Sequence, residues 1–480
     1  MMYTAATTKA LRAGRYTAAR MARGILLAAL IAVGLVLPVL VAGLVTPPAH
    51  AGTTTPPPIV VTFNGDQGDL DPNDGVCDFS TATSQDCTLR AAIEEANART
   101  GPDEIDFLVR NAFRDPATGV VTFTPQSALP VITGRVTING YSQPGAHPNT
   151  LAKGTDAAPK VQLDGTNLPN DIGLELHGSS GSVIRGLVIN RFNKGIELDG
   201  GTASNRIEGN FIGTDPSGTI DRGNNDGVII RGAAQNTIGG TTPAVRNLIS
   251  GNNNVGIFFL AGDASRVLGN LVGTDASGTG ALSNDGFGVA LSIISVAAGT
   301  TGNRIGNGTA EGSNTVAFNG LAGIVAGGKG TVHNPILRNS IFSNGGLGID
   351  LVPISDDGTN AVFGVTPNDS GDADVGANGL QNFPVISSAK SSSTATAITG
   401  KLSSTAGRTF TVEFYSNPSF TDEGKTFLGK KSVTTDSSGK AAFTFKPASR
   451  VPVGRAITAT ATDASGNTSE FSAPTQVAKG

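Results

Sequence analysis

The sequence predicts an all-β chain, a right-handed parallel β-helix (solenoid) followed by a carboxyl-terminal β-sandwich. Two observations favour this class. A segment that begins at Asn205 returns almost unchanged at Ser265, an offset of 60 residues, and periodicity of this kind is typical of solenoid proteins. Glycine supplies 65 of the 480 residues and tryptophan is absent, a composition that suits tightly turned β structure.

Two shorter motifs divide the repeat into coils. Asn-x-Ile/Val recurs at Asn205, Asn210, Asn236, Asn247, Asn270, Asn303, Asn314 and Asn339. Gly-Ile/Val recurs at Gly195, Gly227, Gly256, Gly288, Gly323 and Gly348. The glycine steps lie 25 to 35 residues apart, so the longer offset spans two coils. α-Helices rarely form in segments that Asn and Gly interrupt every few residues. We therefore expect short strands, with asparagines stacked from coil to coil at the turns rather than binding a ligand.

A short helix is expected to cap the amino-terminal end of the solenoid. Apolar residues between Thr88 and Ala98 fall on one helical face, Thr88 is a suitable N-cap, and Glu94 and Glu95 should point away. The chain's two cysteines, Cys77 and Cys87, lie just upstream. In an exported protein such a pair predicts a disulfide.

These residues carry a resemblance. The run from Asp74 to Cys77, with the segment Cys87-Thr-Leu-Arg-Ala-Ala-Ile-Glu-Glu-Ala-Asn97, resembles the CSLREA-type amino-terminal motif of secreted bacterial β-helix proteins, with Thr88 for Ser and Ala91 for Glu. Residues 59–475 share this resemblance for most of their length. It implies the architecture and a secreted or surface location, and it carries over no catalytic residue.

The amino terminus has the order of an export signal. Five basic residues precede an apolar run from Ile25 to Val45, and Ala49-His50-Ala51 fits a cleavage site before Gly52. The run is also long enough to span a bilayer if the signal stays uncleaved, which is the one membrane attachment we expect. We therefore predict a signal peptide over residues 1–51 and a disordered neck with the disulfide-closed cap over 52–100.

The carboxyl-terminal region changes in character after Pro384. Short alternating segments near Phe410, Phe443 and Ile457 are separated by turn sequences, which predicts an immunoglobulin-like β-sandwich over residues 385–480. The β-helix is accordingly expected over residues 101–384. The sandwich should cover the end of the solenoid or present it on a stalk.

The charge balance argues against nucleic acid as a partner. The whole chain has 34 basic and 38 acidic residues, and loss of the signal leaves 29 basic residues against the same 38. No basic run survives to neutralise phosphates. We expect a monomer whose partner is a polysaccharide or a cell-surface molecule.

Two acidic segments are candidate calcium sites, and no other cofactor is predicted. The first contains Asp69, Asp71, Asn73 and Asp74, although Asp74 stands where an EF-hand requires glycine. The second contains Asp369, Asp372 and Asp374. Both supply the several oxygens that calcium prefers, and both are also compatible with solvated acidic loops.

No catalytic residue is assigned. For a polysaccharide-active enzyme, Asp199, Asp226, Asp285 and Asp350 are the best candidates, because each lies near a repeated glycine step and a glycoside hydrolase needs two carboxylates about 5 to 9.5 Å apart. A lyase would need a basic residue, and Arg191 and Lys194 precede Asp199. Structural roles are expected for His177 and His333.

The sequence thus predicts a secreted or cell-surface scaffold, an adhesin-like binding protein without catalytic activity. The alternative is a lyase or glycoside hydrolase that uses carboxylates on the solenoid face. Sugar-binding surfaces commonly present exposed Trp or Tyr, and beyond the signal the chain has only Tyr141 and Tyr415. A rigid rod with repeated polar faces suits adhesion through many weak contacts.

Overall fold

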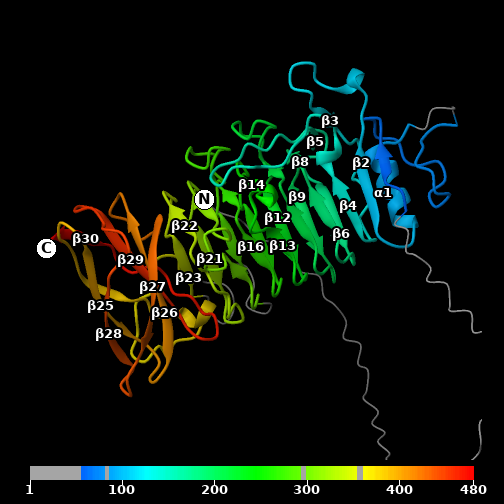
Figure 1. The fold of residues 1–480 in the computed structure, drawn as a ribbon. Coiled ribbons are helices and arrows are strands. Elements are labelled where there is room, and N and C mark those ends of the chain that lie inside the picture. Colours follow the sequence, from blue (N-terminus) through cyan, green and yellow to red (C-terminus); the bar gives the residue numbers. More distant parts are fainter. Residues whose placement is uncertain (1–55, 82–85, 293–298, 354–360) are drawn as a thin grey trace, which may run out of the picture. The chain divides into compact units, whose positions relative to one another are not determined.

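The computed structural model describes residues 56–81, 86–292, 299–353 and 361–480. The predicted signal peptide lies outside these residues. Within them, three parallel sheets wind around a common core and a fourth, mixed sheet forms the carboxyl-terminal domain (Figure 1). The predicted β-helix and carboxyl-terminal β domain are confirmed. None of the helices in the described ranges has the length and apolarity needed to cross a membrane.

Sheet A is the first of the three parallel sheets, and its strands come one from each coil. In spatial order they are β1 (Ile59–Val61), β2 (Asp103–Phe107), β4 (Val136–Asn139), β7 (Val183–Arg185), β10 (Arg206–Glu208), β13 (Thr237–Gly239), β16 (Arg266–Leu268) and β19 (Arg304–Ile305). Residues Arg206 and Arg266, which are 60 apart in sequence, pair with the same residue, Thr237 on β13. The long repeat therefore spans two coils, as predicted.

Sheets B and C complete each coil. Sheet B contains β3 (Val121–Phe123), β5 (Val161–Asp164), β8 (Leu187–Asn190), β11 (Phe211–Ile212), β14 (Leu248–Ile249), β17 (Leu271–Val272), β20 (Thr315–Ala317) and β22 (Ser340–Phe342). Sheet C contains β6 (Ile172–His177), β9 (Lys194–Asp199), β12 (Asp226–Arg231), β15 (Ile257–Leu260), β18 (Val289–Leu291), β21 (Ile324–Gly327) and β23 (Ile349–Val352). Inward-facing Ile, Leu and Val of the three sheets form one continuous buried core.

The repeated asparagines form hydrogen-bonded ladders, as the sequence predicts. One ladder runs through members of the predicted motif, Asn210, Asn247, Asn270, Asn314 and Asn339. A second ladder, whose residues lie outside that motif, runs through Asn224, Asn252, Asn284, Asn319 and Asn344. In each ladder, the side-chain oxygen of one asparagine accepts from the asparagine of the preceding coil. All of these side chains except Asn344 are buried, so the ladders satisfy polar groups that would otherwise be costly.

The repeated glycines are required by the close approach of neighbouring coils. A Cβ added to Gly227 would lie 2.4 Å from the carbonyl oxygen of Gly256, and one added to Gly256 would lie 2.7 Å from that of Gly288. The same contact continues to Gly323 and Gly348. Any side chain at this column would push two coils apart, which explains why a glycine precedes the apolar residue in each repeat.

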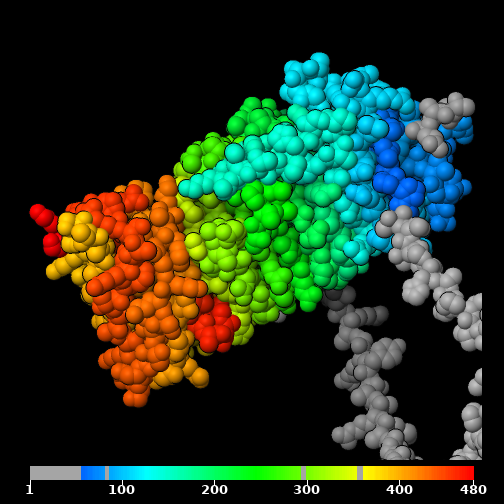
Figure 2. All heavy atoms as spheres, viewed as in Figure 1, coloured from blue at the N-terminus to red at the C-terminus, as the bar shows by residue number. Residues whose placement is uncertain are grey.

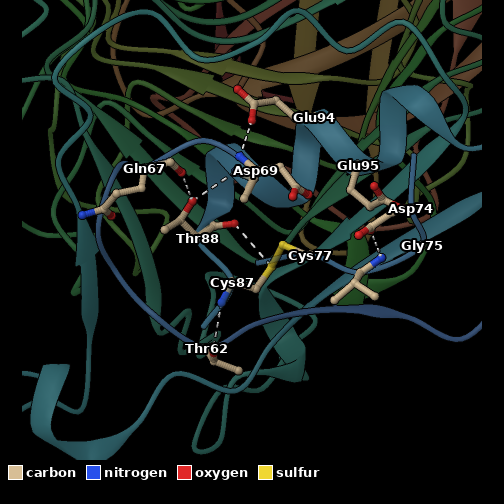
Figure 3. Close-up of a disulfide and its surroundings, with 12 residues drawn as sticks. Thr62, Gln67, Asp69, Asp74, Gly75, Cys77, Cys87, Thr88, Glu94 and Glu95 are labelled. Carbon is tan, nitrogen blue, oxygen red and sulfur yellow. Dashed lines mark hydrogen bonds between the residues drawn. A yellow bond between two sulfur atoms is a disulfide. The ribbon is translucent and has the colours of Figure 1, made fainter. Parts of the chain in front are cut away.

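The amino-terminal end of the β-helix is covered by α1 (Leu89–Ala98) (Figure 3). The Thr88 side chain caps it by accepting from the Ala91 N–H at 3.1 Å, and the predicted disulfide joins Cys77 to Cys87. The expectation that Glu94 and Glu95 point away is wrong. Both side chains bind the preceding loop, accepting from the N–H groups of Asp69 and Asn73, and this contact buries Glu95 completely.

The predicted neck and cap segment also contributes a strand to the solenoid. Strand β1 pairs in parallel with β2, with Ile59 opposite Ile105. Within the part of the chain that the structure describes, four short 3-10 helices connect other elements. They are η1 (Asn111–Phe113), η2 (Gly140–Ser142), η3 (Pro243–Val245) and η4 (Ala377–Leu380).

The carboxyl-terminal domain has its own apolar core and a single strand order. That order is β27 (Thr426–Thr434), β26 (Thr409–Asn417), β29 (Ala456–Thr462), β30 (Thr475–Lys479), β24 (Val385–Ser391), β25 (Thr396–Ser403) and β28 (Lys440–Phe445). The β24 and β30 pair is parallel and the other pairs are antiparallel. The strands thus form one continuous series rather than two unconnected sheets, and membership of the immunoglobulin-like class stays a prediction.

Hydrogen bonds join this domain to the last coils of the β-helix. The carboxylate of Glu423 accepts from the N–H of Ser343 at 2.7 Å, and that of Glu470 accepts from the N–H of Leu351 at 3.0 Å. Ile341 and Gly424 exchange backbone hydrogen bonds as an antiparallel bridge. The domain thereby satisfies backbone donors that the final coil would leave exposed.

Candidate functional site

Six charged or polar side chains gather on the outer face of sheet C, and we call them the sheet C cluster. They are Glu175 and His177 on β6, Lys194, Glu197 and Asp199 on β9, and Arg231 on β12. Alternation along each strand places five of them there, and the Lys194 side chain joins them through its ion pair with Glu197. Leu176 and Leu198 point into the core and are fully buried, so the residues on either side of them project outward.

The strand register brings these side chains together across coils. Glu175 pairs with Glu197, and His177 pairs with Asp199. Asp199 in turn pairs with Arg231 on the next strand. Neighbouring parallel strands lie about 4.8 Å apart, so the cluster forms a compact patch from residues that span three coils.

Glu197 lies at the centre of the cluster between two cations. Its carboxylate is 2.6 Å from the Lys194 ammonium and 2.8 Å from the Arg231 guanidinium, and only 4% of its side chain is exposed. A buried carboxylate without partners is strongly unfavourable. The two ion pairs therefore fix Glu197 and hold both cations at its carboxylate, and Arg231 lies opposite Asp199 on the neighbouring strand.

Three ligand atoms converge at the edge of the cluster. One atom each from Glu175, His177 and Asp199 lie within 4.8 Å of one another. The imidazole Nδ1 is 4.0 Å from a carboxylate oxygen of Asp199, with 56% and 30% of the two side chains exposed. One nitrogen and two carboxylate oxygens suit a divalent transition ion. The same groups can also exchange a proton with a bound molecule.

Four residues of this site were not predicted from the sequence: Glu175, His177, Glu197 and Arg231. A structural role was expected for His177, yet its side chain is exposed on the outer face next to Asp199. A signal was present in the sequence. Gly173-Leu-Glu-Leu-His177 aligns with Gly195-Ile-Glu-Leu-Asp199, and this alignment of two coils matches the observed register.

Beyond the cluster, the outward row of sheet C becomes apolar. The row continues from Glu197 through Ile229, Phe258, Ala290 and Val325. These residues are buried and form a separate apolar cluster. The row ends at Asp350 on β23, so this apolar stretch separates the sheet C cluster from the next charged residue of the row.

The structure does not bring the four candidate catalytic aspartates together. Asp226 is buried at the start of β12, where its carboxylate accepts from the Asn254 side chain at 2.8 Å and from the Val255 N–H at 3.2 Å. Burial raises the pKa of Asp226. Asp285 lies exposed in a turn. Asp350 is buried on β23, and burial raises its pKa to about 6.

The distance between Asp199 and Asp226 follows from the register. Asp226 is opposite Lys194, and Asp199 is five residues farther along β9. At about 3.3 Å per residue, the two lie roughly 16 Å apart along the strand direction. Glycosidases place their two carboxyl groups about 5 to 9.5 Å apart, so this pair does not have that spacing.

The first acidic segment is organised by backbone hydrogen bonds. The Asp69 and Asp74 carboxylates accept from the N–H groups of Asp71 and Val76, as in ordinary turns. Burial raises the pKa of Asp69 to about 6. Among the described residues, this segment brings no three His, Cys or carboxylate ligand atoms within 4.8 Å of one another. Figure 3 shows Asp69 and Asp74 beside α1.

The second acidic segment does converge. Carboxylate oxygens of Asp369, Asp372 and Asp374 lie within 4.8 Å of one another. Burial, together with the neighbouring Asp369 and Asp372 charges, raises the pKa of Asp374, and one of its oxygens is buried without a hydrogen-bond partner. An all-oxygen set of this kind fits calcium better than a transition ion.

The solved structures that resemble this chain do so at low similarity. No family model matches it, and no curated protein matches it in sequence. The A-module of mannuronan C-5 epimerase AlgE4 from Azotobacter vinelandii aligns with a TM-score of 0.34 and 13% identity, over 58% of this chain and 71% of that one. ORF18 of Geobacillus virus E2 aligns with a TM-score of 0.25 and 14% identity, over 82% and 79%. A mutant of the periplasmic alginate epimerase AlgG aligns with a TM-score of 0.26 and 12% identity, over 53% and 77%. At this level the alignments assign no activity to the chain.

Proposed function

We propose that this chain is a secreted scaffold that binds a polysaccharide or another cell-surface molecule without converting it. The observation that carries the proposal is the separation of its acidic side chains. The aspartates nominated for catalysis lie on different coils or are buried in structural hydrogen bonds. Glu197, the most central carboxylate of the sheet C cluster, is held by two ion pairs.

Rigidity supports a scaffolding role. Buried asparagine ladders tie each coil to the next, and carboxylates of the carboxyl-terminal domain bind the final coils. A rigid body loses little conformational freedom when it binds, so a repeated surface can engage an extended partner through many weak contacts. The carboxyl-terminal domain, which we place in the immunoglobulin-like class, would extend this rod.

Secretion rests on three features of the sequence and fold. The amino terminus has the order of an export signal, the motif around Cys87 resembles the CSLREA type, and Cys77 and Cys87 form a disulfide. Disulfides of this kind persist in oxidising compartments. Expression of the full chain with a carboxyl-terminal tag, followed by mass determination of the exported product, should give a chain that begins at Gly52.

The experiment that tests the function combines binding with turnover. Purified residues 52–480 are incubated with a panel of acidic and neutral polysaccharides, with and without calcium. We expect retention on at least one polysaccharide, no new reducing ends and no unsaturated-uronate absorbance. Turnover by the purified chain would contradict a purely binding role, and retention on none of the panel would contradict polysaccharide binding.

A polysaccharide-active enzyme is the second candidate, and one observation favours it. Glu175, His177 and Asp199 converge at the surface, and Arg231 lies opposite Asp199 on the next strand. A divalent ion at the trio together with the Arg231 guanidinium could bind a uronate carboxylate. Without the ion, His177 could exchange a proton with the bound sugar. Turnover that is abolished by His177→Gln and by Asp199→Asn, but kept by Asp285→Asn, would establish this alternative.

A further inference from the structure

A groove of about 690 Å³ lies beside sheet B. Its lining residues come from seven segments of the chain, within residues 152–154, 241–246, 269–271, 277–279, 310–315, 338–342 and 425–427. Ligand pockets commonly have volumes of about 300 to 1,000 Å³. The groove is therefore large enough to hold part of an extended ligand.

One wall of the groove is a segment that runs along the coils. The chain between η2 and β5, coloured cyan to teal, lies over the green coils in Figure 2. The N–H of Thr155 donates to the carbonyl of Ala276 at 2.7 Å. The Arg246 guanidinium donates to the carbonyls of Leu151 and Ala152, each at 3.0 Å. Arg246 is thus a positioning residue that fixes this wall.

The groove is lined by four basic residues and one acidic residue. The basic residues are Lys153, Arg246, Arg338 and Lys425, and the acidic residue is Glu311, which is exposed. Among the described residues, none of the four cations has a carboxylate within 4.0 Å. Burial lowers the pKa of Arg246, because its charge has left water without gaining an anionic partner. The Arg338 charge still interacts with those of Glu311 and Glu413 at longer range. In a chain with more acidic than basic residues, this concentration of cations without a direct ion pair is a local exception.

Two of the cations are held in place by aromatic rings. The Lys425 ammonium lies 3.9 Å from the centroid of the Phe342 ring, and the Arg338 guanidinium lies 4.6 Å from that of Phe427. Each pair joins the last coil of the β-helix to the carboxyl-terminal domain. Cation-π contacts of this kind orient a charge while leaving its outer side available to an anion.

The rest of the lining combines apolar residues and glycines with seven hydroxyl-bearing side chains. Hydroxyl groups come from Thr241, Ser277, Thr279, Ser313, Thr315, Ser340 and Thr426. Hydroxyls both donate and accept hydrogen bonds, and they match the hydroxyls of a sugar ring. Unpaired cations match carboxylates. These two features occur together in a uronate-bearing polysaccharide.

We propose that this groove binds a segment of an acidic, carboxylate-bearing polysaccharide, with Lys153, Arg338 and Lys425 contacting its carboxylates. This rests on the proposed binding function and names its substrate class and its site. Glu311 opposes such a ligand from the groove wall. Removing the negative charge of Glu311 should therefore strengthen binding, whereas removing the lysine charges should weaken it.

The test measures binding of a fluorescently labelled oligogalacturonate to residues 52–480 by polarisation. The carboxyl-reduced, neutral form of the same oligosaccharide is the ligand control. We expect the Lys153→Gln/Lys425→Gln double variant to lose about tenfold in affinity, and Glu311→Gln to gain about threefold, with both effects decreasing at high salt. Lys401→Gln, which removes an exposed charge on β25 away from the groove, should bind like the native chain.

The possible results test the ligand class, the groove and the binding function separately. Equal binding of the acidic and neutral oligosaccharides would overturn the proposed ligand class. Native-like affinity of the double variant, with melting temperature unchanged, would overturn the groove as the site while leaving a polysaccharide-binding scaffold intact. Failure of the native chain to bind any polysaccharide would overturn the proposed function together with the groove.

Discussion

The carboxylate of Glu423 accepts two hydrogen bonds from Asn344, one from the backbone N–H at 2.9 Å and one from the side-chain amide at 3.1 Å. Asn344 is the last member of a ladder whose earlier members each donate to the asparagine of the next coil. Glu423 therefore occupies the position that a further asparagine would fill. The carboxyl-terminal domain thus ends the solenoid by supplying a carboxylate acceptor where each coil supplies an asparagine oxygen.

Truncating this cap should destabilise the β-helix. Glu423→Ala removes the acceptor for the N–H groups of Ser343 and Asn344 and for the Asn344 side-chain amide, at a cost of about 1 to 3 kcal/mol in the free energy of unfolding, because hydrogen bonds to a charged acceptor are lost. Urea denaturation followed by far-UV circular dichroism measures this. Asp285→Asn, at an exposed turn, is the matched control and should change stability little. Equal effects of the two variants would remove the capping role.

The ladders should be as important inside the rod as at its end. Asn270→Ala deletes the donor to the Ile238 carbonyl and the acceptor for Asn247, and should cost about 2 to 4 kcal/mol because both partners stay buried. Asn253→Ala, at an exposed position on a neighbouring coil, serves as control. A destabilisation by Asn270→Ala no greater than that by Asn253→Ala would show that the ladder contributes nothing measurable.

Stability should decrease as the pH rises from about 5 to about 8. Burial raises the pKa of Glu470 to about 8, whereas an unfolded glutamate titrates near 4.3. Between these values the folded state binds the extra proton, so raising the pH favours unfolding by up to about 1.4 kcal/mol per pH unit. Glu470→Gln does not titrate and should flatten the profile. A profile that is equally steep in Glu470→Gln would assign the effect to other groups.

Calcium should stabilise the chain through the second acidic segment. A ligand that binds only the folded state at a hundred times its Kd adds about 2.7 kcal/mol, so calcium should raise the melting temperature and a chelator should reverse the shift. Asp374→Asn should abolish the response because Asp374 supplies the unpartnered buried oxygen. Asp199→Asn should keep it. Melting that is insensitive to chelator in the native chain would exclude a calcium site here.

The architecture could be predicted from the sequence because its determinants are local or periodic. The Gly-Ile/Val step marks each coil, and the observed contact of Gly227 with Gly256 shows why. The asparagine motif anticipated the ladders, and the spacing of Cys77 and Cys87 anticipated the disulfide. The ladders and glycine contacts repeat between neighbouring coils, and the two cysteines are close in sequence. None of these features depends on contacts between distant parts of the sequence.

The candidate sites depend on contacts that periodicity does not encode. His177 reaches Asp199 only through the register of β6 with β9. Glu95 was expected to point away, yet the loop at Asn73 folds back and buries it. The groove combines Lys153, Arg338 and Lys425, which come from segments more than 80 residues apart in sequence. The overall composition of the chain indicates an acidic surface, and it does not show where basic residues gather in the fold.

The most direct test of the central claim is an NMR measurement on the polysaccharide itself. A uronate polysaccharide retained by residues 52–480 is incubated with the chain and with divalent cations, and its proton spectrum is followed for cleavage, unsaturation and change of stereochemistry. We expect the polysaccharide signals to broaden on binding and the covalent structure of the polysaccharide to be unchanged after release. New end-group or altered ring signals that disappear with His177→Gln would contradict it and identify the sheet C cluster as an active site.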